Sequence, residues 1–202
     1  MLVNAKEMLD KAYENGYAIA HFNTNNLEWT KAILESCEEK KTAVIIASSE
    51  GAVKYMGGFN TVAALVKTMH DDLGITVPVA LHLDHGSYEG AKKAIDAGYT
   101  SVMFDGSSLP LEENLEKTRE IVDLAHAKGI SVEGEVGGIG GEEDGVTSEG
   151  ELADVEECKQ LADTGIDFIA AGIGNIHGVY PDDWKGLNFD RLKEVSLSLI
   201  HI

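Results

Sequence analysis

Short apolar runs alternate with amphipathic stretches along most of the chain. The apolar runs are rich in β-branched or small residues, which predicts strands at 17–22, 43–47, 79–83, 101–104, 131–136 and 168–171. Between them, apolar residues recur at three- and four-residue spacing, which predicts helices at 27–40, 61–72, 88–97, 111–128 and 155–164. The predicted order of elements is therefore βαβα throughout.

Single glycines mark the ends of the predicted helices. Gly74, Gly98, Gly129 and Gly165 each follow a helical pattern and precede a strand, where glycine adopts the left-handed conformation of a helix cap most easily. The stretch 1–16 is also helical in pattern and has neither the charged region nor the cleavage site of a signal peptide. Because no linker or low-complexity segment interrupts the pattern, we treat residues 1–202 as one domain.

Repeated βα units require right-handed crossovers and a parallel sheet, which leaves a doubly wound open sheet or a (β/α)8 barrel. Polar residues lie at the C-terminal ends of the predicted strands: Asn23, Ser48, Ser49, Asp84, His85, Asp105, Glu135 and the stretch 174–177. A barrel gathers all its strand ends around one mouth, so this pattern favours the (β/α)8 TIM barrel. Only about six βα units can be counted, whereas a barrel takes about 250 residues, so we expect an incomplete barrel without its last two strands.

Composition and charge exclude several classes of protein. The 202 residues include 16 Lys and Arg against 35 Asp and Glu, a formal net charge of −19, with 44% hydrophobic residues. The chain has no basic stripe for nucleic acid or anionic lipid, and no apolar run near the roughly 20 residues of a membrane helix. The two cysteines, Cys37 and Cys158, lie in separate predicted helices, as packing thiols in a reducing cytoplasm do. We expect a cytoplasmic protein with a small-molecule partner, not nucleic acid or a membrane.

The segment VALHLDHGS, residues 79–87, ends an apolar strand in three titratable groups. Strand periodicity places His82 and Asp84 on one face, and His85 lies where the strand gives way to a turn at Gly86. Three such groups in a buried strand are costly unless they are paired or bind a metal. This segment therefore predicts a functional site.

Two further segments add acids and an imidazole to the same mouth. Glu133 and Glu135 share a face of the strand in SVEGEVGGIGGEEDG, whose glycines predict a mobile acidic loop, either a closing lid or a merely solvated segment. His177 in IAAGIGNIHGVY supplies an imidazole from another strand, and Asp105 follows SVMF. Imidazoles that converge from different strands suit a divalent ion such as Zn²⁺.

Six segments carry a resemblance to a known family, the class II, metal-dependent ketose-bisphosphate aldolases of the fructose- or tagatose-bisphosphate type. They are AHFNTNNLEWTKAI at 20–33, SSEGA at 48–52, VALHLDHGS at 79–87, AIDAGYTSVMFDGSSLPLEEN at 94–114, VEGEVGGIGGEEDG at 132–145 and GIGNIHGVYP at 172–181. The resemblance implies a (β/α)8 barrel, a homodimer or homotetramer, and a zinc-dependent lyase of glycolysis and carbohydrate metabolism. The implied reaction cleaves a sugar bisphosphate reversibly into dihydroxyacetone phosphate and glyceraldehyde 3-phosphate.

The resemblance also implies roles for residues of the catalytic machinery. His85 and His177 match two of the three ligands of the catalytic zinc. Asp84 matches the acid/base at the C4 hydroxyl, and Glu143 matches the lid carboxylate that exchanges a proton of dihydroxyacetone phosphate. No lysine ends a predicted strand to form a Schiff base, so a Lewis acid must stabilise the developing negative charge.

Other positions match secondary sites of the family. Asp105 and Glu135 match the carboxylates of a second divalent-ion position, with Glu135 able to approach the zinc. Asn23 and Ser49 match substrate contacts, and Gly178 belongs to a loop that binds phosphate and a monovalent cation.

The chain departs from the family pattern in two places. Pro181 stands where many relatives have a lysine, so Lys185 is the nearest candidate for a phosphate contact. The next family strand, which bears the third zinc histidine, has no counterpart, and residues from about 195 are unlike the family; His201 is a poor substitute because no glycine-rich loop follows it. We therefore expect a C-terminally truncated fragment that is inactive as an aldolase.

Two alternatives stay open at this stage. One is another metal-dependent TIM-barrel enzyme such as a binuclear hydrolase, although the first strand offers only His21 before Phe22 in place of an H-x-H pair. The other is a fragment that binds metal without catalysis. The choice between fructose and tagatose stereochemistry cannot be made from these residues.

Overall fold

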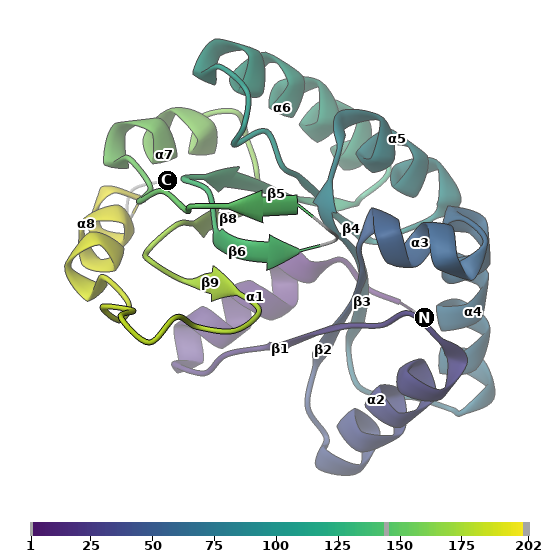
Figure 1. Ribbon diagram of the computed structural model, residues 1–202. Coiled ribbons are helices and arrows are strands. Elements are labelled where there is room, and N and C mark those ends of the chain that lie inside the picture. The colour runs from purple at the N-terminus through teal and green to yellow at the C-terminus, as the bar shows by residue number, and fades with distance from the viewer. Residues whose placement is uncertain (1, 144–145, 200–202) are drawn as a thin grey trace.

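The computed structural model describes residues 2–143 and 146–199, and its centre is a curved sheet of six parallel strands (Figure 1). The strands pair in the order in which they occur along the chain, and they are β1 Ala20–Asn23, β2 Val44–Ser48, β3 Val79–Gly86, β4 Ser101–Phe104, β5 Ser131–Val136 and β8 Phe168–Ala171. The sheet is open between β1 and β8 and forms six strands of a (β/α)8 barrel, as the βα repeat predicts.

Helices follow the strands in an arc around the outer side of the sheet (Figure 1). They are α2 Leu27–Lys40, α3 Glu50–Met56, α4 Phe59–Asp72, α5 Tyr88–Ala97, α6 Leu111–His126, α7 Val155–Ala162 and α8 Phe189–Leu199. The apolar faces of α2 to α6 and the outward residues of the strands, such as Val44, Ile46 and Val102, form the largest hydrophobic core, and α7 and α8 pack in a second cluster. None of the helices in the described ranges combines the length and apolar character needed to cross a membrane.

Helix α1, Ala5–Asn15, packs on the other side of the strands. Its buried residues Ala5 and Met8 cluster with Ile45 and Ala80, which alternate along β2 and β3 with the residues that face the outer helices. The backbone N–H of Ala5 donates to Ser131 Oγ on β5 at 3.0 Å. The inner side of the sheet is thus filled next to α1, and the polar strand ends lie beyond this apolar layer.

The glycine-rich segment after β5 forms two strands of a second, small sheet, so the expectation of a loop is wrong for its described part, whereas its mobility stays a prediction. Strand β6, Gly140–Glu143, pairs antiparallel with β7, Val146–Ser148, and parallel with β9, Ile176–His177. Gly141 has a φ of 95°, and a Cβ there would collide with the carbonyl oxygen of His177. Glycine therefore permits close approach of two strands here, which sequence pattern alone cannot distinguish from mobility.

The other predicted elements are close to those observed. Gly74, Gly98, Gly129 and Gly165 have φ values of 63°, 91°, 71° and 95°, so the predicted left-handed conformation is confirmed. Only Gly98 is itself the helix cap, because α4, α6 and α7 end in right-handed cap residues just before their glycines. Strand β1 begins three residues later than predicted, and β3 extends to Gly86. The pattern missed the short helix α3 and the C-terminal helix α8, which covers 189–199.

Candidate metal and active site

His85 owes its orientation to an irregularity at the end of β3. The pairing of β3 with β4 is regular at His82 and Leu83 and then shifts, so that Gly86 pairs with Phe104. His85 lies within this bulge and has a φ of 46°, a left-handed conformation that is uncommon for a residue other than glycine. Bulges redirect side chains, and backbone strain of this kind concentrates at functional sites.

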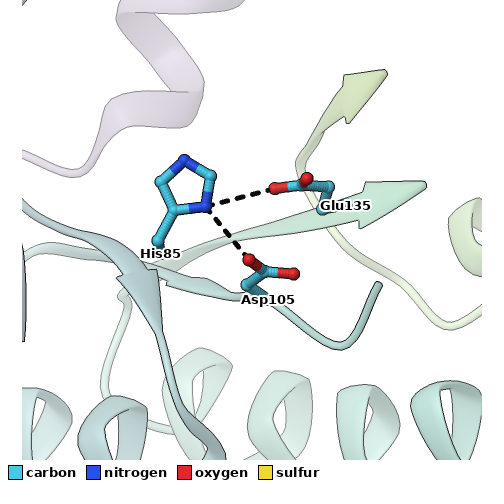
Figure 2. A group of neighbouring side chains, drawn as sticks. All are labelled: His85, Asp105 and Glu135. Atoms are coloured by element: carbon cyan, nitrogen blue, oxygen red, sulfur yellow. Dashed lines mark hydrogen bonds and ion pairs between the residues drawn. The ribbon is translucent and has the colours of Figure 1, made fainter. Parts of the chain in front are cut away.

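Three side chains from neighbouring strands meet at this point, and we call them the donor triad: His85, Asp105 and Glu135 (Figure 2). Nδ1 of His85 lies 3.0 Å from Asp105 Oδ2 and 3.4 Å from Glu135 Oε2. One ligand atom from each residue lies within 4.8 Å of the other two. The Ser107 hydroxyl and backbone N–H donate to Asp105 at 2.7 and 3.1 Å, which fixes the carboxylate.

The electrostatics of the donor triad favour a bound cation. Burial, and then the charge of Asp105, raise the pKa of Glu135 to about 8. Burial opposes ionisation of Asp105 too, but hydrogen bonds from His85 and Ser107 outweigh it and lower its pKa. Within the described ranges, Glu135 Oε2 is buried and accepts no hydrogen bond. An imidazole and two carboxylates at this separation are a donor set that fits a divalent ion.

A second imidazole lies beside the donor triad. The rings of His85 and His177 have centroids 5.2 Å apart and meet edge to face at 78°. His177 is the last residue of β9, and its backbone pairs with Gly141 of β6. His177 is not one of the three donors that lie within 4.8 Å of each other, but its position depends on the small sheet that carries the acidic segment.

Asp84 lies in the same pocket and is held by β1. Asn23 Nδ2 donates to Asp84 Oδ2 at 2.8 Å, and the Asp84 residue is 8% exposed. This pocket, which we call the central pocket, has a volume of about 320 Å³. Its lining residues are His21, Asn23, Asp84, His85, Met103, Glu133, Ile139, Ala170 and His177. The structure therefore brings the predicted residues Asn23, Asp84, His85 and His177 around one cavity.

The remaining predicted residues lie apart from this pocket or beyond the described atoms. The Ser49 hydroxyl accepts from Ala52 N at 3.2 Å, caps α3, and lines a separate cavity of about 400 Å³ to which Asn23 also contributes. Lys185 lines two other cavities, neither of which shares a lining residue with the central pocket. Gly178 follows β9 with a φ of 78°.

The side chains of two residues predicted or considered from the sequence lie outside the part of the chain that the structure describes. Glu143 ends β6, but its side chain lies outside the described residues, as does all of His201.

Sequence reasoning missed His21 as a pocket residue. Desolvation by the surrounding protein atoms, and then the neighbouring His82, lower the pKa of His21, although the residue is exposed at the open edge of the sheet. The signal was available, because His21 and Asn23 are two positions apart on a strand and so share a face.

Comparisons with known proteins agree with this geometry. The sequence profile of the family described as "Fructose-bisphosphate aldolase class-II" matches residues 3–202. A fructose-bisphosphate aldolase of Streptococcus pyogenes serotype M1 is 57% identical over 198 residues, which are 98% of this chain and 68% of that protein. One of Ureaplasma parvum serovar 3 is 56% identical over 195 residues, 96% of this chain and 67% of that protein.

Solved structures show the same relationship. A putative fructose-1,6-bisphosphate aldolase from Coccidioides immitis superposes with a TM-score of 0.88 at 33% identity and covers 97% of this chain, which spans 69% of that one. The YdjI aldolase from Escherichia coli K12 superposes with a TM-score of 0.83 at 33% identity, over 98% of this chain and 70% of that one. The chain thus belongs to the class II fructose-bisphosphate aldolase family, whose members are metal-dependent enzymes.

Proposed function

We propose that this chain carries the metal-binding and proton-transfer residues of a zinc-dependent ketose-bisphosphate aldolase. The reaction is the reversible aldol cleavage of fructose 1,6-bisphosphate, or its tagatose isomer, into dihydroxyacetone phosphate and glyceraldehyde 3-phosphate. The observation that carries the proposal is the convergence of the donor triad, with the His177 ring beside it and Asp84 in the same pocket.

His85 and His177 are the proposed zinc ligands on this chain, with Glu135 able to approach the ion and Asp105 close to His85. When bound, zinc supplies a Lewis acid that stabilises negative charge developing on the substrate carbonyl oxygen. Asp105 and Glu135 also offer carboxylates to a second divalent ion. His21 of β1 is the third imidazole that lines the pocket, and it is not one of the three donors that lie within 4.8 Å of one another.

Asp84 is the proposed acid/base for the C4 hydroxyl. Its carboxylate borders the pocket, next in sequence to His85, and the amide of Asn23 holds one oxygen at 2.8 Å. A carboxylate fixed in this way can accept the hydroxyl proton as the C3–C4 bond breaks and return it in the reverse reaction.

Glu143 is the proposed carboxylate for proton exchange on dihydroxyacetone phosphate. Its strand, β6, pairs with the strand that carries His177, so the acidic segment lies next to the proposed metal ligand. Asn23 and Ser49 are proposed substrate contacts, Gly178 a phosphate and monovalent-cation contact, and Lys185 a phosphate contact. We also propose a cytoplasmic homodimer or homotetramer for the complete enzyme.

An aldol-cleavage assay tests this proposal. We would compare the 202-residue chain with a chimera that continues into the C-terminal third of the Streptococcus pyogenes relative. We expect zinc-dependent cleavage of fructose or tagatose 1,6-bisphosphate by the chimera and none by the chain alone, whose sheet is open between β1 and β8. A folded chimera that binds zinc but cleaves neither sugar contradicts the proposal, and comparable turnover by the unextended chain contradicts the expectation that it is inactive.

A second assay tests Glu143. The chimera with Glu143→Ala should lose exchange of the dihydroxyacetone phosphate proton with solvent while keeping its zinc. Glu142 is adjacent and exposed, so Glu142→Ala and the double variant separate the two residues. Exchange at the normal rate in Glu143→Ala would refute the assignment.

A further inference from the structure

A second set of polar side chains lies on the same three strands that carry the donor triad. His82 of β3 contacts both Ser101 of β4 and Glu133 of β5, and we call these three residues the inner triad. Sequence periodicity pointed to His82 and Glu133 but gave neither a role, and it did not identify Ser101. None of the roles proposed above uses these three residues.

The inner triad is buried and connects β3 to β5 across β4. His82 Nδ1 lies 2.8 Å from Ser101 Oγ, and His82 Nε2 lies 3.1 Å from Glu133 Oε2, which is within ion-pair distance but without the geometry of a hydrogen bond. His82 is 1% exposed and Ser101 0%, whereas the Glu133 side chain, at 15%, borders the central pocket. A polar cluster this deeply buried stabilises one arrangement of its strands only when its contacts are kept, because a group left unpaired there is costly.

The inner triad lies next to the donor triad along the same strands. His82 pairs with Ser101 in the last regular part of the β3–β4 ladder, immediately before the bulge that contains His85. Glu133 precedes Glu135 by two residues and so lies on the same face of β5. Backbone pairing alone does not fix His85 within the bulge, whereas the side chains of the inner triad fix the strands at its base.

We infer that the inner triad positions the donor triad for its cation, by holding β3 and β5 at a set separation across β4. This inference rests on the proposed function, because it presumes that His85 and Glu135 bind a divalent ion. His82, Ser101 and Glu133 act in it as positioning residues, and the ion itself need not touch them. Side chains that orient metal ligands commonly change metal affinity by about 10- to 100-fold when they are removed.

Cobalt binding to the 202-residue chain tests the inference, with a matched pair of serine variants. Ser101→Ala removes the anchor of His82. Ser131→Ala is the control, because Ser131 pairs with Ser101 in the β4–β5 register, is equally buried at 1%, and accepts a hydrogen bond from Ala5 of α1 outside the inner triad. Both variants lose one buried hydroxyl, so a general loss of stability affects them alike.

We expect Ser101→Ala to bind Co²⁺ about 10-fold more weakly than the wild-type chain and to shift its d–d absorption bands. Ser131→Ala should stay within about twofold of the wild type with unchanged bands. Glu133→Gln keeps the shape of the side chain, should weaken binding in the same direction, and decides the matter if Ser101→Ala does not fold. Wild-type affinity and spectrum in the folded variants of the inner triad, or equal loss in Ser131→Ala, overturn the inference.

His85→Ala separates failure of the inference from failure of the proposed function. If the wild-type chain and His85→Ala take up Co²⁺ equally, or neither takes it up, the metal site itself is wrong and the inference falls with it. If only His85→Ala loses the ion while Ser101→Ala and Glu133→Gln behave as wild type, the metal site stands and the positioning role alone is refuted.

Discussion

The central strands β2 and β4 and the edge strands β1 and β8 differ in how completely they are buried. Every residue of β2 and β4 is buried, whereas all four residues of β1 are exposed and all four of β8 are half-buried. The central strands have a neighbour on each side and helices on their outer face, whereas β1 and β8 each pair on one side only. The fully buried strands of this sheet are therefore ones that have a partner on each side.

The candidate site is divided in the same way. The donor triad and Asp84 belong to β3, β4 and β5 or follow them directly, and each of these strands is paired on both sides. Asn23 and His177 reach the pocket from β1 and β9, whose side chains are exposed or half-buried. One half of the site is thus fixed by the core, and the other half depends on weakly buried elements.

The largest expected effect is on aldol cleavage, where we compare Asp84 with Asn23, its hydrogen-bond partner on the edge strand β1. In the chimera, Asp84→Asn should lower aldol cleavage by about 10²- to 10⁴-fold, because it removes a proton carrier. Asn23→Ala should cost only about 10-fold, since it removes one hydrogen bond that holds the carboxylate. Steady-state kinetics with zinc content measured in parallel checks both; equal losses, or loss of zinc in Asp84→Asn, would contradict the division of roles.

Truncation of an apolar side chain should cost more stability at the centre than at the edge. Leu81 of β3 is fully buried, so Leu81→Ala should lower the free energy of unfolding by about 2–5 kcal/mol. Ile169 of β8 is half-buried, and Ile169→Ala should cost less than about 2 kcal/mol. Urea unfolding followed by circular dichroism measures both values, and a larger loss for Ile169→Ala would break the comparison.

A buried hydroxyl pair at the centre predicts a response to alkaline pH. Burial raises the pKa of Tyr99 to about 12, and Tyr99 Oη lies 2.8 Å from Ser48 Oγ. A folded-state pKa above the unfolded value of about 10 contributes stability that is complete below pH 10 and is lost as the pH rises toward 12. The free energy of unfolding of the wild type should fall between pH 9 and pH 12. In Tyr99→Phe this fall should be about 2–3 kcal/mol smaller. Identical pH dependence in the two proteins would exclude this linkage.

The smallest expected effect is on an edge-strand phenylalanine. Phe22 of β1 is 45% exposed, so Phe22→Ser should change the unfolding free energy by less than about 0.5 kcal/mol. Phe104 of β4 is 2% exposed and gives a matched control, for which the same substitution should cost about 3 kcal/mol or more. Thermal melts of the two variants measure the difference, and similar melting temperatures would show that the exposure of β1 does not matter.

The regular part of this fold could be predicted from the sequence because its determinants are local. Each central strand is a short apolar run, and each of four helices is followed within three residues by a glycine whose φ is positive. Parallel strands with polar ends place Asp84, His85, Asp105 and Glu135 at one mouth as soon as the βα order is known. The family resemblance then gave these residues their chemistry.

The remaining features depend on contacts that local pattern does not encode. The bulge at His85 breaks the period of two, and a non-glycine residue with positive φ gives no signal in the sequence. The segment rich in glycine reads as a loop, although Gly141 is there because a side chain would collide with the backbone of His177. Ser101 belongs to the inner triad only because β4 lies between β3 and β5.

Zinc retention by the 202-residue chain tests most directly whether the donor triad is a metal site. The wild-type protein, His85→Ala, Glu135→Gln and His126→Ala would be loaded with zinc, dialysed and analysed for metal content; His126 is exposed on α6 beside Asp167 and serves as the control. We predict that the wild type and His126→Ala retain the ion, that Glu135→Gln retains it more weakly, and that His85→Ala loses it. Equal zinc content in the wild type and His85→Ala would contradict the account.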